Sequence, residues 1–219
     1  MYDYVEDKQF LKRAQHYCTN IMKELEENLR SQGMNTQFFL VGSGARNMIT
    51  QNGDGKIDID YNLNIISCTD WKARNIKELI RKNFNQVMRN NNLHDVEDST
   101  SSLTTKLIYF NDEPDIEFKI DVCIVTEQDD NWYRLIHRKT GFMQVDEYFW
   151  NEAPHSKNCK DKADQIKKVL GWWEVVRNKY LEIKNHYLKL HDNNHPSYIC
   201  YVEAVNNVYN DMKQKRIIK

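Results

Sequence analysis

The most constraining feature of this chain is a run of alternating residues from Lys56 to Ile66. Every second side chain in it is apolar, and those between are acidic or carry amides. This period of two predicts a β-strand with one buried face. Asp58 and Asp60 fall on its polar face, about 6–7 Å apart along the backbone, because residues i and i+2 of a strand point the same way.

A second alternating run, over residues 115–125, supplies a third acidic side chain, Asp121. If its strand lies beside the first, Asp121 joins Asp58 and Asp60 on one face. Three converging carboxylates carry too much negative charge to stay unpaired, and divalent cations are their usual partners. Metal-assisted phosphoryl chemistry is therefore the first hypothesis. The alternative is an exposed polar face of a half-buried sheet, where alternation alone places aspartates.

A short glycine-serine turn, Gly42-Ser43-Gly44, follows the apolar run of residues 38–41. Glycines let the backbone turn its amides toward a ligand. Arg46 comes three residues after Ser43, as either a phosphate contact or a surface arginine at a helix start. The turn and the aspartates together predict a site for phosphate and metal.

Periodicity along the rest of the chain predicts an α/β (α+β) protein. A mixed sheet flanked by helices occupies residues 1–153, and a helical region occupies residues 154–219, with the boundary near Pro154. The apolar spacing of three and four predicts helices over residues 10–29, 71–88, 163–190 and 197–212. Strands are expected over residues 38–41, 56–66, 103–110 and 115–125, with one or two more within 132–150. Residues 50–55 read as a turn.

This arrangement resembles the nucleotidyltransferase superfamily typified by DNA polymerase β. Gly42 and Ser43 match the family's turn, Ile57-Asp58-Ile59-Asp60 its metal-binding pair, and Asp121 its third carboxylate. The gap between Gly44 and Ile57 is longer than the family pattern, through an insertion around residues 52–55. The resemblance covers about residues 35–125.

The resemblance implies attack of an acceptor on the α-phosphate of a nucleoside triphosphate such as ATP, with release of pyrophosphate. Two Mg²⁺ ions, or Mn²⁺ instead, stabilise the entering and leaving oxygens in such reactions. Asp58 and Asp60 would bridge the metals and hold the triphosphate, and Asp121 would hold the second metal near the acceptor. Gly42, Ser43 and Arg46 would bind the β- and γ-phosphates.

The acceptor stays open between a small molecule, a second nucleotide, an RNA end and a protein hydroxyl. A net charge of -1 disfavours long nucleic acid. The alternative function is a non-catalytic module of the same fold that binds a nucleotide or another partner. We expect a cytoplasmic protein without a membrane contact, because no apolar run approaches the length of a span and the acidic N-terminus lacks a signal-peptide stretch.

Two other metal interpretations are weaker. Residues 52–58 resemble the middle of an EF-hand loop, but the first and last ligand positions would be Thr50 and Tyr61, and a strand follows in place of a helix. The five cysteines are widely spaced without a CxxC pair, which is typical of reduced thiols and gives no zinc site.

Overall fold

The computed structural model describes residues 1–153, 158–192 and 196–218. Its contacts divide the chain into two compact units. The sheet unit comprises Val5–Ile49 and Asp54–Ala153, and the helical unit comprises Met1–Tyr4, Thr50–Gly53 and Pro154–Lys219. Pro154, where the sequence places a domain boundary, lies outside the described residues. None of the helices in the described ranges has both the length and the apolar character that a membrane span requires.

The sheet unit is built on a mixed sheet, as the sequence predicts. β4 and β8 run parallel at its centre, and the other pairings are antiparallel. The main strands, in spatial order, are β10 (Glu147–Glu152), β9 (Asn131–Arg138), β8 (Glu113–Gln128), β4 (Ile57–Ser67) and β2 (Asn35–Leu40). Two short strands, β6 (Leu103–Thr104) and β7 (Ile108–Phe110), pair with β8, and a third, β5 (Glu97–Asp98), pairs with β6.

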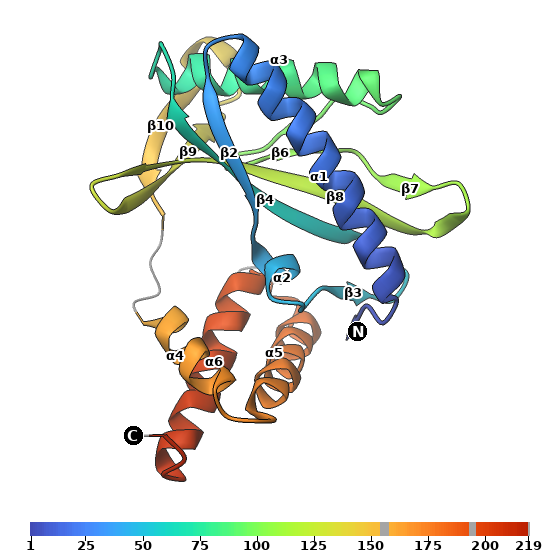
Figure 1. Ribbon diagram of the computed structural model, residues 1–219, viewed down its shortest axis with the longest axis vertical. Coiled ribbons are helices and arrows are strands. Elements are labelled where there is room, and N and C mark those ends of the chain that lie inside the picture. Colours follow the sequence, from blue (N-terminus) through green and yellow to red (C-terminus); the bar gives the residue numbers. More distant parts are fainter. Residues whose placement is uncertain (154–157, 193–195, 219) are drawn as a thin grey trace. The chain divides into compact units, whose positions relative to one another are not determined.

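The alternation of β4 separates its two faces. Ile57, Ile59 and Tyr61 are at most 2% exposed, while the residues between them are exposed or half-buried. The helices α1 (Lys8–Ser31) and α3 (Ala73–Asn90) contribute apolar side chains to the same core, and α1 crosses the sheet on that side (Figure 1). Burial of this apolar face holds the sheet in one register, because a slip of one residue would bring the aspartates into the core.

The strand predicted over residues 103–110 is interrupted in the structure. β6 and β7 are separated at residues 105–107, where Thr105 makes two bonds to β8. Its N–H donates to the Ile120 carbonyl at 3.0 Å, and its hydroxyl accepts the Ile120 N–H at 2.9 Å. A side chain thus replaces a backbone partner, and the continuous ladder ends there. β7 and β8 still form the predicted hairpin.

The helical unit contains α4 (Cys159–Lys167), α5 (Trp172–Lys189) and α6 (Ser197–Gln214) (Figure 1). The prediction of one helix over residues 163–190 is wrong, because Gly171 takes a left-handed conformation at φ 81° between α4 and α5.

Residues 50–55, which the sequence predicts to be a turn, are only partly a turn in the structure. β3 (Thr50–Asn52) pairs antiparallel with β1 (Tyr2–Tyr4), a pairing that has no periodic signal in the sequence.

Candidate functional site

The three predicted aspartates come from neighbouring positions on the polar face of the sheet. Asp60 is the register partner of Asp121 across the parallel pair β4 and β8, and Asp58 lies opposite Lys119. Adjacent strands are about 4.8 Å apart, so the backbones of Asp60 and Asp121 are in contact range. Asp58 is exposed, whereas Asp60 and Asp121 are half-buried. The parallel pairing thus brings the acidic residues of two distant segments together.

The glycine turn lies directly against the second aspartate. The backbone N–H of Val41 donates to the Asp60 carbonyl at 2.8 Å, which ties the end of β2 to β4. Gly42 follows at φ 63°, and a Cβ atom there would lie 2.2 Å from Asp60 Oδ2. Glycine is therefore favoured at residue 42 both by its backbone conformation and by the close approach of the carboxylate.

Replacing Gly42 by alanine tests this approach. We expect Gly42→Ala to lower the affinity for the nucleoside triphosphate that the sequence resemblance implies at least ~10-fold, because the new methyl group displaces the Asp60 carboxylate, in addition to about 1–2 kcal/mol of left-handed strain. Gly53→Ala is the matched control, since Gly53 has φ 54° but nothing within 4 Å of its added Cβ. Chemical denaturation and calorimetry separate the two effects. Equal nucleotide affinity in the two variants would contradict the role of the close approach.

Ser43 and Arg46 complete the turn, which forms the single helical turn α2 (Gly42–Ala45). The Ser43 carbonyl accepts the Met48 N–H at 2.9 Å. Arg46 Nη1 donates to the Gly42 carbonyl at 2.6 Å, so this side chain folds back onto the turn. This hydrogen bond between Arg46 and Gly42 therefore stabilises the conformation of the turn.

Burial and negative neighbours shape the electrostatics of the site. Burial, together with the charges of Asp121 and Asp58, raises the pKa of Asp60 from 3.8 to about 6. The guanidinium groups of Arg46 and Arg134 act in the opposite direction. A carboxylate whose pKa is raised in this way is typical of a functional site, and a nearby cation stabilises its ionised form.

The donor set fits a hard divalent cation, because it consists of carboxylate oxygens. Asp60 in particular is a buried carboxylate whose negative neighbours disfavour its charge. Within the described residues, however, no group of three or more histidine, cysteine, aspartate or glutamate side chains is gathered closely enough to hold a metal ion. The three aspartates are thus neighbours on one face without forming a closed ligand cage.

Two polar residues of the site were not predicted from the sequence. Thr104, on β6, donates its hydroxyl hydrogen to Asp121 Oδ1. The positive charge of Arg134, on β9, lowers the pKa of Asp60. The Arg134 Nε atom is buried without a hydrogen-bond partner among the described residues. For Arg134 the β-favouring neighbours Trp132, Tyr133 and Ile136 are a local signal of a strand. For Thr104 no local signal exists, because its contact depends on the pairing of β6 with β8.

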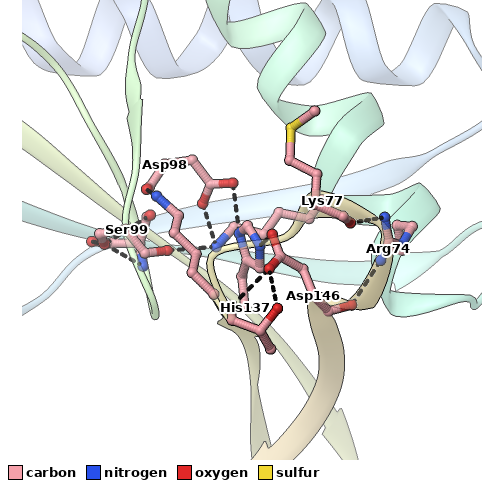
Figure 2. A network of polar contacts seen from close by, with 10 residues as sticks. Arg74, Lys77, Asp98, Ser99, His137 and Asp146 are labelled. Atoms are coloured by element: carbon pink, nitrogen blue, oxygen red, sulfur yellow. Dashed lines mark hydrogen bonds and ion pairs between the residues drawn. The ribbon is translucent and has the colours of Figure 1, made fainter.

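A second polar network lies buried in the same unit (Figure 2). His137 is placed between two carboxylates, with Nδ1 at 2.9 Å from Asp98 and Nε2 at 3.0 Å from Asp146. Lys77, on α3, reaches Asp98 at 2.7 Å and the Ser99 carbonyl at 2.8 Å. Burial lowers the pKa of Lys77, and Asp98 opposes that shift. The network thereby joins α3, β9 and the β5–β6 hairpin.

The sequence matches no family model and no curated protein. The structure is similar to the CD-NTase CdnG of Bradyrhizobium diazoefficiens in complex with GTP, with a TM-score of 0.57 and 12% identity over 90% of this chain and 65% of that chain.

Two further solved structures have lower scores. The CdnE cyclic dinucleotide synthase of Elizabethkingia meningoseptica, with GTP and Apcpp, has a TM-score of 0.49 and 16% identity over 90% of this chain and 78% of that chain. The cyclic AMP-GMP synthase DncV of Vibrio cholerae has a TM-score of 0.49 and 14% identity over 69% of this chain. This chain spans 38% of the DncV chain.

The likeness to CdnG establishes the fold. The chain has a mixed α+β fold like that of CdnG, with a multi-strand mixed sheet and flanking helices. The resemblance predicted from the glycine-serine turn and the aspartates is therefore confirmed at the level of the fold.

Proposed function

We propose that the chain is a metal-dependent nucleotidyltransferase that transfers a nucleoside monophosphate from a nucleoside triphosphate to an acceptor and releases pyrophosphate. The observation that carries the proposal is the register of β4 and β8, which pairs Asp60 with Asp121 beside the Gly42 turn. CdnG, which has this fold, is bound to GTP. This supports a nucleoside triphosphate as the donor substrate.

The proposed roles follow from the positions of the side chains. Asp58 and Asp60 would hold two divalent cations, Mg²⁺ or Mn²⁺, together with the triphosphate, and Asp121 would share the second ion next to the acceptor. Bound there, the ions would neutralise the charge that develops on the entering and leaving oxygens. Asp121 would orient the acceptor, and the attacking oxygen would pass its proton to the Asp121 carboxylate as its bond to the α-phosphorus forms.

The turn residues would bind the leaving part of the donor. Backbone amides of Gly42 and Ser43, with the Ser43 hydroxyl, present donors to the β- and γ-phosphates. Arg46 keeps the turn in shape through its bond to the Gly42 carbonyl, and its charge favours the ionised form of Asp60. The bond that breaks joins the α-phosphorus to its bridging oxygen, and pyrophosphate departs with the electron pair.

One observation favours a second candidate, a non-catalytic module that binds a nucleotide or partner on the same fold. The described residues contain no closed cluster of acidic, histidine or cysteine ligands. A module of this kind binds a nucleotide without releasing pyrophosphate in the presence of any acceptor pool.

Calorimetric titration tests the proposal. We expect non-hydrolysable GTP or ATP with Mg²⁺ to bind the wild-type chain, and the double variant Asp58→Asn with Asp60→Asn to lose at least ~100-fold in affinity, because several kcal/mol of cation-mediated attraction disappear. Asp54→Asn is the control, since Asp54 is an exposed aspartate in the turn before β4. Unchanged binding in the double variant would remove the aspartates from the site.

Product analysis separates the two candidates. Wild-type chain is incubated with α-labelled nucleoside triphosphate, Mg²⁺ and a mixed pool of small-molecule, nucleotide, RNA and protein acceptors. Transfer of label with release of pyrophosphate is the expected result. Binding without any pyrophosphate release would favour the non-catalytic module.

A further inference from the structure

The carboxylate of Asp121 is held by a side chain that the proposed mechanism does not use. Thr104 and Asp121 are register partners across the antiparallel pair β6 and β8, and the Thr104 hydroxyl donates to Asp121 Oδ1. Both residues are half-buried. A charge-assisted hydrogen bond of this kind fixes the orientation of an aspartate more firmly than bulk water does.

Thr104 is in turn the end of a row of hydroxyl groups. Its Oγ1 lies 3.4 Å from Ser102 Oγ, which lies 2.8 Å from Ser99 Oγ. The turn between β5 and β6 is closed by further bonds, since Ser99 Oγ accepts the Ser102 N–H at 3.1 Å and Ser99 N–H donates to the Ser102 carbonyl at 3.0 Å. These bonds make the hairpin that carries Thr104 a well-defined structure.

The far end of the hairpin is anchored in the buried network of Figure 2. Lys77 Nζ donates to the Ser99 carbonyl at 2.8 Å, and the backbone N–H of His137 donates to the Thr100 carbonyl at 2.7 Å. Asp98, next to Ser99, is bound by both Lys77 and His137. The hairpin is thus fixed to α3 on one side and to β9 on the other.

We propose that Thr104 is a positioning residue for Asp121, and that the anchored β5–β6 hairpin is the support that keeps it in place. The proposal rests on the function proposed above, because it concerns the acidic residue that faces the acceptor. Residues that orient a metal ligand from behind alter metal affinity or activity by ~10–100-fold when they are removed. Thr104 orients Asp121, a proposed metal ligand, in the same way, through the hydrogen bond from its hydroxyl to Asp121 Oδ1.

The test compares Thr104→Val, which keeps the shape but loses the hydroxyl, with Thr104→Ser, which keeps the hydroxyl. Binding of Mn²⁺ alone is followed by electron paramagnetic resonance. We expect Thr104→Val to weaken Mn²⁺ binding ~10-fold and Thr104→Ser to stay within ~2-fold of wild type. Equal Mn²⁺ affinity in Thr104→Val and wild type, or an equal loss in both variants, would overturn the proposal.

Kinetics on an acceptor found in the product screen give an independent readout. Because Thr104 acts on the acceptor side, Thr104→Val is expected to lower kcat ~10-fold or more while KM for the nucleoside triphosphate stays within ~2-fold. A rise in KM with unchanged kcat would contradict the assignment. Absence of transfer by the wild-type chain would overturn the proposed function, whereas transfer by wild type and Thr104→Val at the same rate would overturn only the role of Thr104.

A second variant keeps the test decisive if Thr104→Val does not fold. Ser102→Ala removes the next hydroxyl of the row and leaves Thr104 in place. We expect the Mn²⁺ affinity of Ser102→Ala to be lower than that of wild type but higher than that of Thr104→Val, for which the expected loss is ~10-fold. Wild-type affinity in folded Ser102→Ala would then count against the supporting role of the hairpin.

Discussion

Replacing Asp60 by asparagine is expected to abolish nucleotidyl transfer and, at the same time, to stabilise the protein at pH 8 in the presence of a chelator. Transfer should fall by at least ~10³-fold, because the loss of a metal-bridging carboxylate removes several kcal/mol of transition-state stabilisation. The stability gain has a different origin. Burial and the charges of Asp121 and Asp58 raise the pKa of Asp60 from 3.8 to about 6, so the folded state opposes its ionised form.

The sign of the pH dependence follows from this raised pKa. Below about pH 4 the carboxyl group is protonated in both states and contributes nothing, whereas above about pH 6 it is ionised in both and destabilises the folded state. The rise of the Asp60 pKa from 3.8 to about 6 corresponds to at most about 3 kcal/mol. Asp60→Asn should therefore exceed wild type in unfolding free energy at pH 8, and the difference should vanish as the pH falls toward 4.

Urea denaturation at a series of pH values measures the effect. Asp54→Asn serves as the control, because this exposed aspartate is expected to change stability by no more than ~0.5 kcal/mol. If Asp60→Asn were less stable than wild type at pH 8, the carboxylate would be satisfied by the protein itself, and the inference that it awaits a cation would be wrong.

Replacing Lys77 by methionine is expected to cause the largest loss of stability in the sheet unit. The Lys77 side chain is 2% exposed and that of Asp98 is 9% exposed, and the ammonium nitrogen lies 2.7 Å from the carboxylate. Methionine fills a similar volume but leaves Asp98 buried with His137 as its remaining side-chain partner. Removing one member of a buried pair costs about 3–5 kcal/mol.

Lys82→Met is the matched control, because Lys82 lies on the same helix with an exposed side chain. Its expected change is within ~0.5 kcal/mol. Unfolding free energies of the two variants are compared by guanidinium denaturation. The double variant Lys77→Met with Asp98→Asn should recover part of the loss, because it removes the unpaired charge. A loss below ~1 kcal/mol in Lys77→Met would show that the pair is not truly excluded from water.

The elements that carry the site could be predicted because their signals are local. The alternation of residues 57–65 fixes both the strand and the face of Asp58 and Asp60, since a half-buried strand has a period of two. Gly42 was predicted from its place in a turn, and its positive φ bears this out. The helices over residues 10–29 and 71–88 were equally clear from their apolar stripes, which face the core as α1 and α3.

Features that depend on distant pairings were missed. Thr104 reaches Asp121 only because β6 adds to the edge of β8, and the two residues are 17 positions apart. β1 and β3 are three residues long each, too short for a periodic signal. The division between α4 and α5 was hidden because both helices continue the same apolar spacing across Leu170 and Gly171.

The most direct test of the acidic site is a crystal structure of the wild-type chain with a non-hydrolysable nucleoside triphosphate and Mn²⁺, with anomalous data collected at the manganese edge. We expect two anomalous peaks at about 2.2 Å from carboxylate oxygens of Asp58 and Asp60, one of them also bound by Asp121. A triphosphate bound away from the Gly42 turn, or manganese peaks that none of these three carboxylates contacts, would contradict the proposed site.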